Sequence, residues 1–104
     1  MNEAIVKKIQ RRRRQLLVHS YMYYELNDST IDDATWSERA LELERLQRDY
    51  PEESAAAKYY EEFKGFDHST GADLDYFKDW VMRDAQVLLD ARDKQNERTK
   101  WRQR

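Results

Sequence analysis

The sequence contains no cysteine, one proline and only two glycines in 104 residues. The lack of cysteine excludes disulfides, thiolate metal sites and a cysteine nucleophile. Because turn-forming residues are so scarce, a sandwich or barrel of many short strands is excluded as well. No apolar run reaches the ~18 residues of a membrane-spanning helix, and the first residues do not resemble a signal peptide. These absences predict one all-α domain over residues 1–104, in the cytoplasm and without membrane contact.

Apolar residues make up 39% of the chain and charged residues 38%, so the core must be small and built from large side chains. Apolar side chains recur three or four positions apart in four stretches, as in amphipathic helices. Pro51 suits only the start of a helix, and Gly65 is expected to end one. We therefore expect a small bundle of about four helices, with an antiparallel pair at the N-terminus and the fourth helix packed across it. The expected helices are Glu3 to about Leu26, one beginning at Asp32 or Asp33, Pro51 to Lys64, and one following a cap at Asp73.

Basic residues are concentrated at both ends of the chain. Residues 1–14 contain six Lys and Arg against one acidic residue, residues 92–104 contain six against two, and between them acidic residues outnumber basic ones by eighteen to seven. Clustered arginines neutralise phosphate, so one hypothesis is that the arginine run of the first segment contacts nucleic acid. The alternative is that the basic ends are solvated helix termini lying over the acidic body. The arginines concerned are Arg11, Arg12, Arg13 and Arg14.

Two expectations about packing follow from these basic segments. Because the arginine run contains no apolar residue, the first helical turns are expected to project beyond a core that begins at Leu16. After Ala91 the apolar periodicity stops, which predicts that residues 92–104 form a basic tail. This tail is either an extended helix or disordered until a partner orders it, and in both cases we expect it to add little stability.

Residues 16–52 combine several features in a fixed order. An aromatic-rich helix end, Tyr21-Met22-Tyr23-Tyr24, is followed by a turn, and Ile31-Asp32-Asp33-Ala34-Thr35-Trp36 begins the next helix. A stretch rich in leucine and glutamate then closes on Tyr50-Pro51-Glu52. Across about a third of the chain, this segment resembles the small N-terminal helical subdomain of NAD-dependent DNA ligases.

The resemblance implies a site for the nicotinamide mononucleotide half of NAD, with aromatic rings around the nicotinamide. The matching positions are Tyr23, Tyr24, Asp33, Trp36 and Ser37. Trp36 replaces a tyrosine and keeps a flat π surface, whereas Ser37 replaces an aspartate and loses a carboxylate. That loss predicts an affinity no better than millimolar. The alternative for the same residues is that their rings pack between the first two helices and Asp33 only caps the second.

No catalytic constellation is apparent. The resemblance places the ligase nucleophile, a lysine in a Lys-x-Asp-Gly motif, on a separate and larger domain, and Lys64-Gly65-Phe66-Asp67 has one residue too many. The residue types of a nucleophilic triad at positions 67–70 are neighbours in one loop, so we expect them only to hydrogen-bond locally. His19 and His68 are the only histidines, and no spacing suggests a metal site. The chain is therefore predicted not to be an enzyme by itself.

Two functions remain open at this point. The first is a non-enzymatic, phage-type accessory protein that needs no cofactor and acts by binding another macromolecule. Its partner would be a protein, such as a host nucleic-acid-directed defence or replication complex, or nucleic acid contacted through the basic ends. The alternative is a module that binds nicotinamide mononucleotide or NAD weakly and acts with a larger enzyme. Either protein is expected to be a monomer or a homodimer.

Overall fold

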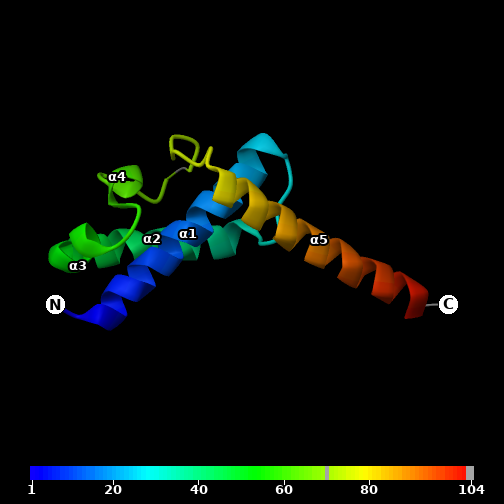
Figure 1. The fold of residues 1–104 in the computed structure, drawn as a ribbon, viewed down its shortest axis with the longest axis horizontal. Helices are drawn as coiled ribbons and strands as arrows, with labels where there is room; N and C mark the ends of the chain where they lie inside the picture. Colours follow the sequence, from blue (N-terminus) through cyan, green and yellow to red (C-terminus); the bar gives the residue numbers. More distant parts are fainter. Residues whose placement is uncertain (70, 103–104) are drawn as a thin grey trace.

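The computed structural model describes residues 1–69 and 71–102, and it confirms an all-α fold. Within these residues there are five helices and no strand. Two long helices lie side by side, two short ones follow, and a third long helix crosses the first (Figure 1). The helices are α1 (Glu3–Glu25), α2 (Asp33–Asp49), α3 (Pro51–Ala56), α4 (Tyr60–Phe63) and α5 (Asp79–Arg102).

Helices α1 and α2 form the predicted antiparallel pair, and local residues explain where each begins. The side chain of Asn2 accepts hydrogen bonds from the backbone N–H groups of Ala4 and Ile5, at 3.0 and 3.3 Å. The Asp32 carboxylate accepts one from the backbone N–H of Thr35 at 2.8 Å. Both contacts satisfy amide groups that a helix N-terminus leaves unpaired. The predicted second helix therefore begins as expected, with Asp32 as its cap.

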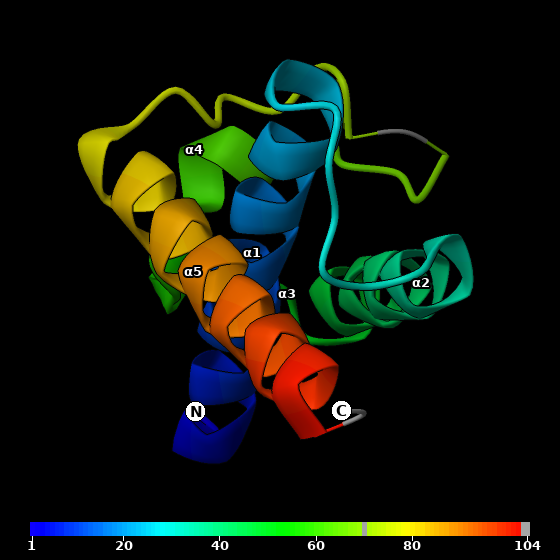
Figure 2. The same ribbon diagram turned by 90° about the vertical axis from the view of Figure 1, so that its right-hand side faces the viewer.

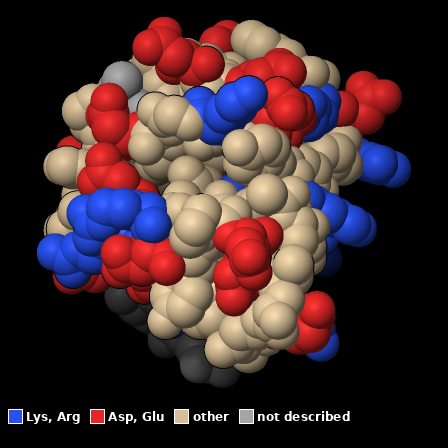
Figure 3. Space-filling model, turned by 90° about the vertical axis from the view of Figure 1, so that its left-hand side faces the viewer, with Lys and Arg blue, Asp and Glu red and all other residues tan. Residues whose placement is uncertain are grey.

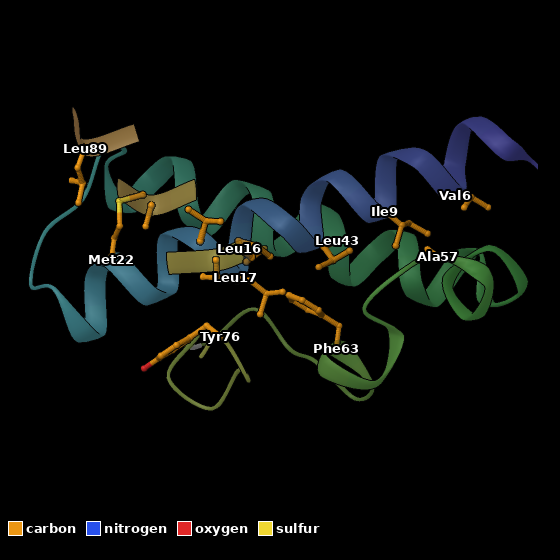
Figure 4. Close-up of a cluster of buried hydrophobic side chains, with 14 residues drawn as sticks. Val6, Ile9, Leu16, Leu17, Met22, Leu43, Ala57, Phe63, Tyr76 and Leu89 are labelled. Carbon is orange, nitrogen blue, oxygen red and sulfur yellow. The ribbon is translucent and has the colours of Figure 1, made fainter. Parts of the chain in front are cut away.

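The core runs along α1, which contacts α2, α3 and α5 (Figures 2 and 4). The expectation that the first turns of α1 project beyond the core is wrong. Val6 and Ile9 are buried there, because α3 folds back against this end of α1. Leu16, Leu17 and Met22 continue the same buried face toward the other end.

The predicted third helix is broken into α3 and α4, and a buried arginine gives the physical reason. Tyr59 takes a left-handed conformation with φ 69°, which interrupts the helix between Ala56 and Tyr60. The break frees backbone carbonyls that a continuous helix would use internally. The Arg13 guanidinium is fully buried and donates to three of them, those of Ser54, Ala57 and Lys58, at 3.0–3.1 Å.

The last helix also begins later than predicted, at Asp79 rather than directly after Asp73. Residues 75–78 before it have no regular secondary structure, and they carry Tyr76 into the core with 4% of its surface exposed. Its hydroxyl donates to the Glu25 carboxylate at 2.6 Å, and burial together with this bond raises the pKa of Tyr76 to about 12. A long-range contact with α1 therefore overrides the local helical periodicity.

Beyond Ala91, α5 continues as a helix through Arg102, which is one of the two states expected for the basic tail. It extends past the other helices in a molecule measuring 54 × 26 × 24 Å (Figure 1). Where this extension begins, Arg92 donates two hydrogen bonds, of 2.7 and 3.1 Å, to the two carboxylate oxygens of Asp28. None of the described helices has the length and apolar character needed to cross a membrane.

Candidate functional site

A hollow of about 190 Å³ lies where the end of α1, the start of α2 and the loop after α4 meet. All five residues predicted to bind a cofactor line it, namely Tyr23, Tyr24, Asp33, Trp36 and Ser37. Ser20, His68 and Ser69 complete the lining. We call this hollow the aromatic slot. The structure thus brings together every cofactor-site residue expected from the sequence, and adds three that were not.

The two tyrosines of the slot stand at the surface rather than in the core. Tyr23 is 54% exposed and Tyr24 is 42% exposed, on the last turns of α1. Their rings meet edge to face with centroids 4.9 Å apart, and Tyr24 also stacks parallel to Tyr76 at 6.5 Å. The alternative that these rings pack between the first two helices is therefore wrong for Tyr23 and Tyr24. Stacking on the buried Tyr76 holds the Tyr24 ring in place.

The first turn of α2 supplies the opposite wall. Asp32 makes the capping bond to Thr35, which holds the pKa of the Asp32 carboxyl below its usual range. Asp33 is therefore not the cap, and its exposed carboxylate has no hydrogen-bond or ionic partner among the described residues. Trp36 is half-buried against the core, and Ser37 is exposed. This wall offers a ligand one aromatic surface and one free negative charge.

The floor of the slot contains an unusual polar group. Ser20 is fully buried, and its hydroxyl oxygen has no hydrogen-bond partner among the described residues. Gly71 packs closely beside it, and a Cβ atom at that position would lie 2.8 Å from Cζ2 of Trp36 and would also clash with Ser20. Only glycine fits this close approach. Buried hydroxyls are normally paired, since leaving one unpaired costs about 1–3 kcal/mol.

The loop after α4 forms the remaining wall. The side chain of His68 hydrogen-bonds to Glu44 of α2 through Nδ1, at 2.9 Å to Oε2. The backbone N–H and the hydroxyl of Ser69 both donate to the Asp67 carboxylate, which lowers the pKa of Asp67. The prediction of local hydrogen bonding is confirmed for Asp67 and Ser69, whereas His68 bonds to the distant Glu44 and Thr70 lies outside the described residues. The position of the loop against the slot was not predicted.

The four consecutive arginines have different surroundings. Arg11 is exposed without an ionic partner among the described residues, and Arg13 is buried. Arg12 pairs with Glu42 at 3.2 Å, whereas Arg14 pairs with Asp84 at 3.2 Å and lies over the ring of Trp80. On the face shown in Figure 3, positive and negative side chains are interspersed rather than gathered into one basic patch. The described contacts of Arg12 and Arg14 match the alternative in which basic residues lie over acidic ones.

Fold and site together define a small helical module with a shallow hollow lined by aromatic side chains. Comparison with known proteins gives the family: a family model described as a DNA ligase-like, N-terminal NAD+-binding domain matches residues 2–58. This match covers more than half of the chain, and the chain belongs to that family. All five predicted slot residues lie inside the matched segment, whereas His68, Ser69 and Gly71 lie beyond it.

Three DNA ligases illustrate the similarity. The chain is 44% identical over 48 residues to that of Coxiella burnetii strain RSA 493, a match that covers 46% of this chain and 7% of the ligase. It is 32% identical over 75 residues to that of Pseudothermotoga lettingae, covering 64% of this chain and 11% of the ligase. It is 44% identical over 45 residues to the DNA ligase of Porphyromonas gingivalis strain W83, a match that covers 43% of this chain and 7% of the ligase. The chain thus matches only a small part of these ligases, and no solved structure matches it significantly.

Proposed function

We propose that this chain is a nicotinamide-binding module, which holds the nicotinamide mononucleotide half of NAD in the aromatic slot and acts with a larger enzyme. One observation carries the proposal: the five residues expected from the family resemblance line a single hollow whose floor is an unpaired, buried hydroxyl. An unsatisfied polar group in a concave, aromatic site is typical of a ligand-binding position.

The size and chemistry of the slot indicate which part of the ligand it takes. A volume of about 190 Å³ is below the ~300–1,000 Å³ of pockets that enclose a drug-sized molecule. It suits one planar ring, with the ribose and phosphate left toward solvent. Tyr23, Tyr24 and Trp36 supply π surfaces for the ring, Ser20 a hydrogen bond for its carboxamide, and Asp33 an acceptor for the ribose hydroxyls.

In this proposal the chain binds and does not catalyse. The slot lining contains aromatic, hydroxyl, carboxylate and imidazole side chains but no lysine among the described residues. A covalent nucleotidyl intermediate needs a nucleophile placed against the reacting phosphate. The larger enzyme would supply it, while this chain orients the nicotinamide end of the cofactor.

Binding is tested by following backbone amide shifts while nicotinamide mononucleotide is titrated into the full chain, with adenosine monophosphate as the ligand control. We expect millimolar saturation confined to residues around the slot. Trp36→Ala should weaken binding by about tenfold, and the exposed Tyr50→Ala, outside the slot lining, should not change it. Ser37→Asp, which restores the carboxylate expected from the resemblance, should strengthen binding by about tenfold. Equal shifts with both nucleotides, or shifts away from the slot, would contradict the proposal.

A further inference from the structure

A second hollow, of about 480 Å³, lies between α1 and α5. The two helices diverge from their crossing, so that their free ends point toward opposite ends of the molecule (Figure 1). The hollow lies along the face of α1 that runs from Lys7 to His19 and shares no lining residue with the aromatic slot. We call it the α1–α5 groove.

The α1 wall of this groove is cationic. Lys7 and Arg11 are one helical turn apart, are exposed, and have no ionic partner among the described residues. Their neighbours differ, because Lys8 and Arg12 both pair with Glu42, at 3.3 and 3.2 Å. Two positive charges with a fixed spacing are therefore available to an external ligand on this wall.

The α5 wall contains two aliphatic side chains and Asp84, which pairs with Arg14, and the floor contains a second unpaired polar atom. Val87 is 65% exposed and Leu88 is 39% exposed, although both are large aliphatic side chains. On the floor, His19 is 6% exposed and its Nδ1 atom has no hydrogen-bond partner among the described residues. The groove thus offers apolar contact area and two positive charges that have no ionic partner among the described residues.

We infer that the α1–α5 groove binds an acidic amphipathic helix of another protein. Helices commonly dock with their apolar face in a groove between two helices, and neighbouring residues on such a face lie three or four positions apart. The apolar face would contact Val87 and Leu88, and two carboxylates one turn apart would pair with Lys7 and Arg11. Nucleic acid fits this surface less well, because one wall is aliphatic and Asp84 adds a carboxylate to the lining.

The probe for this proposal is a blocked synthetic peptide of about 18 residues, long enough to form a helix, with leucines on one face and two glutamates four positions apart. We expect saturable binding to the full chain, with amide shifts confined to α1 and α5. Lys7→Glu/Arg11→Glu and, separately, Val87→Ser/Leu88→Ser should each weaken binding by at least about tenfold. The control Arg48→Glu/Lys64→Glu makes the same charge change outside the groove and should leave affinity unchanged.

A charge-reversed peptide, with lysines in place of the two glutamates, separates specific pairing from general electrostatic attraction. It should bind the Lys7→Glu/Arg11→Glu variant more tightly than the original peptide does. Absence of saturation, or equal weakening in the control variant, would overturn the proposal. Duplex DNA that binds more tightly than the peptide, and loses affinity in the same variants, would also overturn it, because the groove would then bind nucleic acid. A homodimer in sedimentation that Val87→Ser/Leu88→Ser dissociates would do the same, because the groove would then bind a second copy of the chain.

Discussion

The Arg13 cluster, formed by Arg13 and the residues that accept its hydrogen bonds, and the aromatic slot both join α1 to its neighbours, but they differ in whether their buried polar groups are paired. In the cluster, all three guanidinium nitrogens of Arg13 donate hydrogen bonds, and Gln47 and Ser54 provide side-chain acceptors at 3.0 and 2.7 Å. In the slot, the buried hydroxyl of Ser20 has no hydrogen-bond partner among the described residues. A satisfied buried network stabilises the fold, whereas an unsatisfied one leaves binding capacity for a ligand.

The largest effect is expected at Arg13. Arg13→Ala would leave the carbonyls of Ser54, Ala57 and Lys58 without their donor and create a cavity, so the free energy of unfolding should fall by about 3–5 kcal/mol. Urea denaturation measures this change. Arg11→Ala is the matched control from the same run and should stay within about 0.5 kcal/mol of the wild type. Equal effects of the two substitutions would show that the cluster does not hold α3 and α4 in place.

His19 extends the comparison to pH. Burial, with a smaller contribution from the nearby charge of Arg39, lowers its pKa from 6.5 to about 4. Between these pH values His19 is protonated in the unfolded chain but neutral in the folded chain. The free energy of unfolding therefore falls as the pH decreases from 6.5 to 4. We expect a loss of about 1–3 kcal/mol over this window and no contribution from His19 above it. Urea titrations at pH 7 and pH 4.5 should show a smaller difference for His19→Gln than for the wild type.

Gly71 tests whether the slot depends on close packing of its floor. A methyl group there would press on Trp36 and Ser20, so Gly71→Ala should cost about 1–3 kcal/mol and weaken nicotinamide mononucleotide binding by at least about tenfold. Gly65→Ala is the control: its φ of +73° disfavours alanine by about 1 kcal/mol, but nothing lies within 4 Å of the added Cβ. This control should destabilise the chain without changing affinity, which calorimetry and amide shifts can measure separately.

The smallest effect is expected from the end of α5. Removing residues 93–104 leaves Arg92 and its paired contact with Asp28 in place. The melting temperature should therefore change little in a thermal scan by circular dichroism. A decrease above about 8 °C, more than 1 kcal/mol for a domain of this size, would show that this segment packs against the body.

Local signals explain which parts of the fold were predictable. Asp32 caps α2, Gly65 follows α4 with a positive φ, and the expected limits of α1 agree with those observed. The break between Ala56 and Tyr60 and the irregular segment around Tyr76 were not predictable from the apolar spacing, because both depend on hydrogen bonds to distant residues of α1. The competing local propensity is helical in both places, and tertiary hydrogen bonds override it.

The slot shows a similar division. Its five family-type residues were identified from their order along the chain, which a helix–turn–helix converts into proximity. Gly71 carried no recognisable signal, since a glycine within a loop is common. Ser20 lies four residues after Leu16 on the apolar face of the first helix, so the spacing indicates its burial but not its unpaired hydroxyl. Arg13 had a recognisable sequence signal, because it lies four residues after Ile9 and three before Leu16, on the same buried face of the helix. A charged residue at that spacing indicates a buried structural role rather than a surface contact.

The most direct test is the same substitution at the two buried serines. Ser54→Ala removes a hydroxyl that accepts from Arg13 at 2.7 Å, so it should destabilise the fold by about 1–3 kcal/mol without affecting ligand binding. Ser20→Ala removes an unpaired hydroxyl, so stability should stay unchanged or rise by up to about 1 kcal/mol. The same change should weaken nicotinamide mononucleotide binding by about three- to tenfold. If Ser20→Ala instead destabilises the chain as Ser54→Ala does and leaves affinity unchanged, Ser20 is a structural residue and the slot is not organised around it.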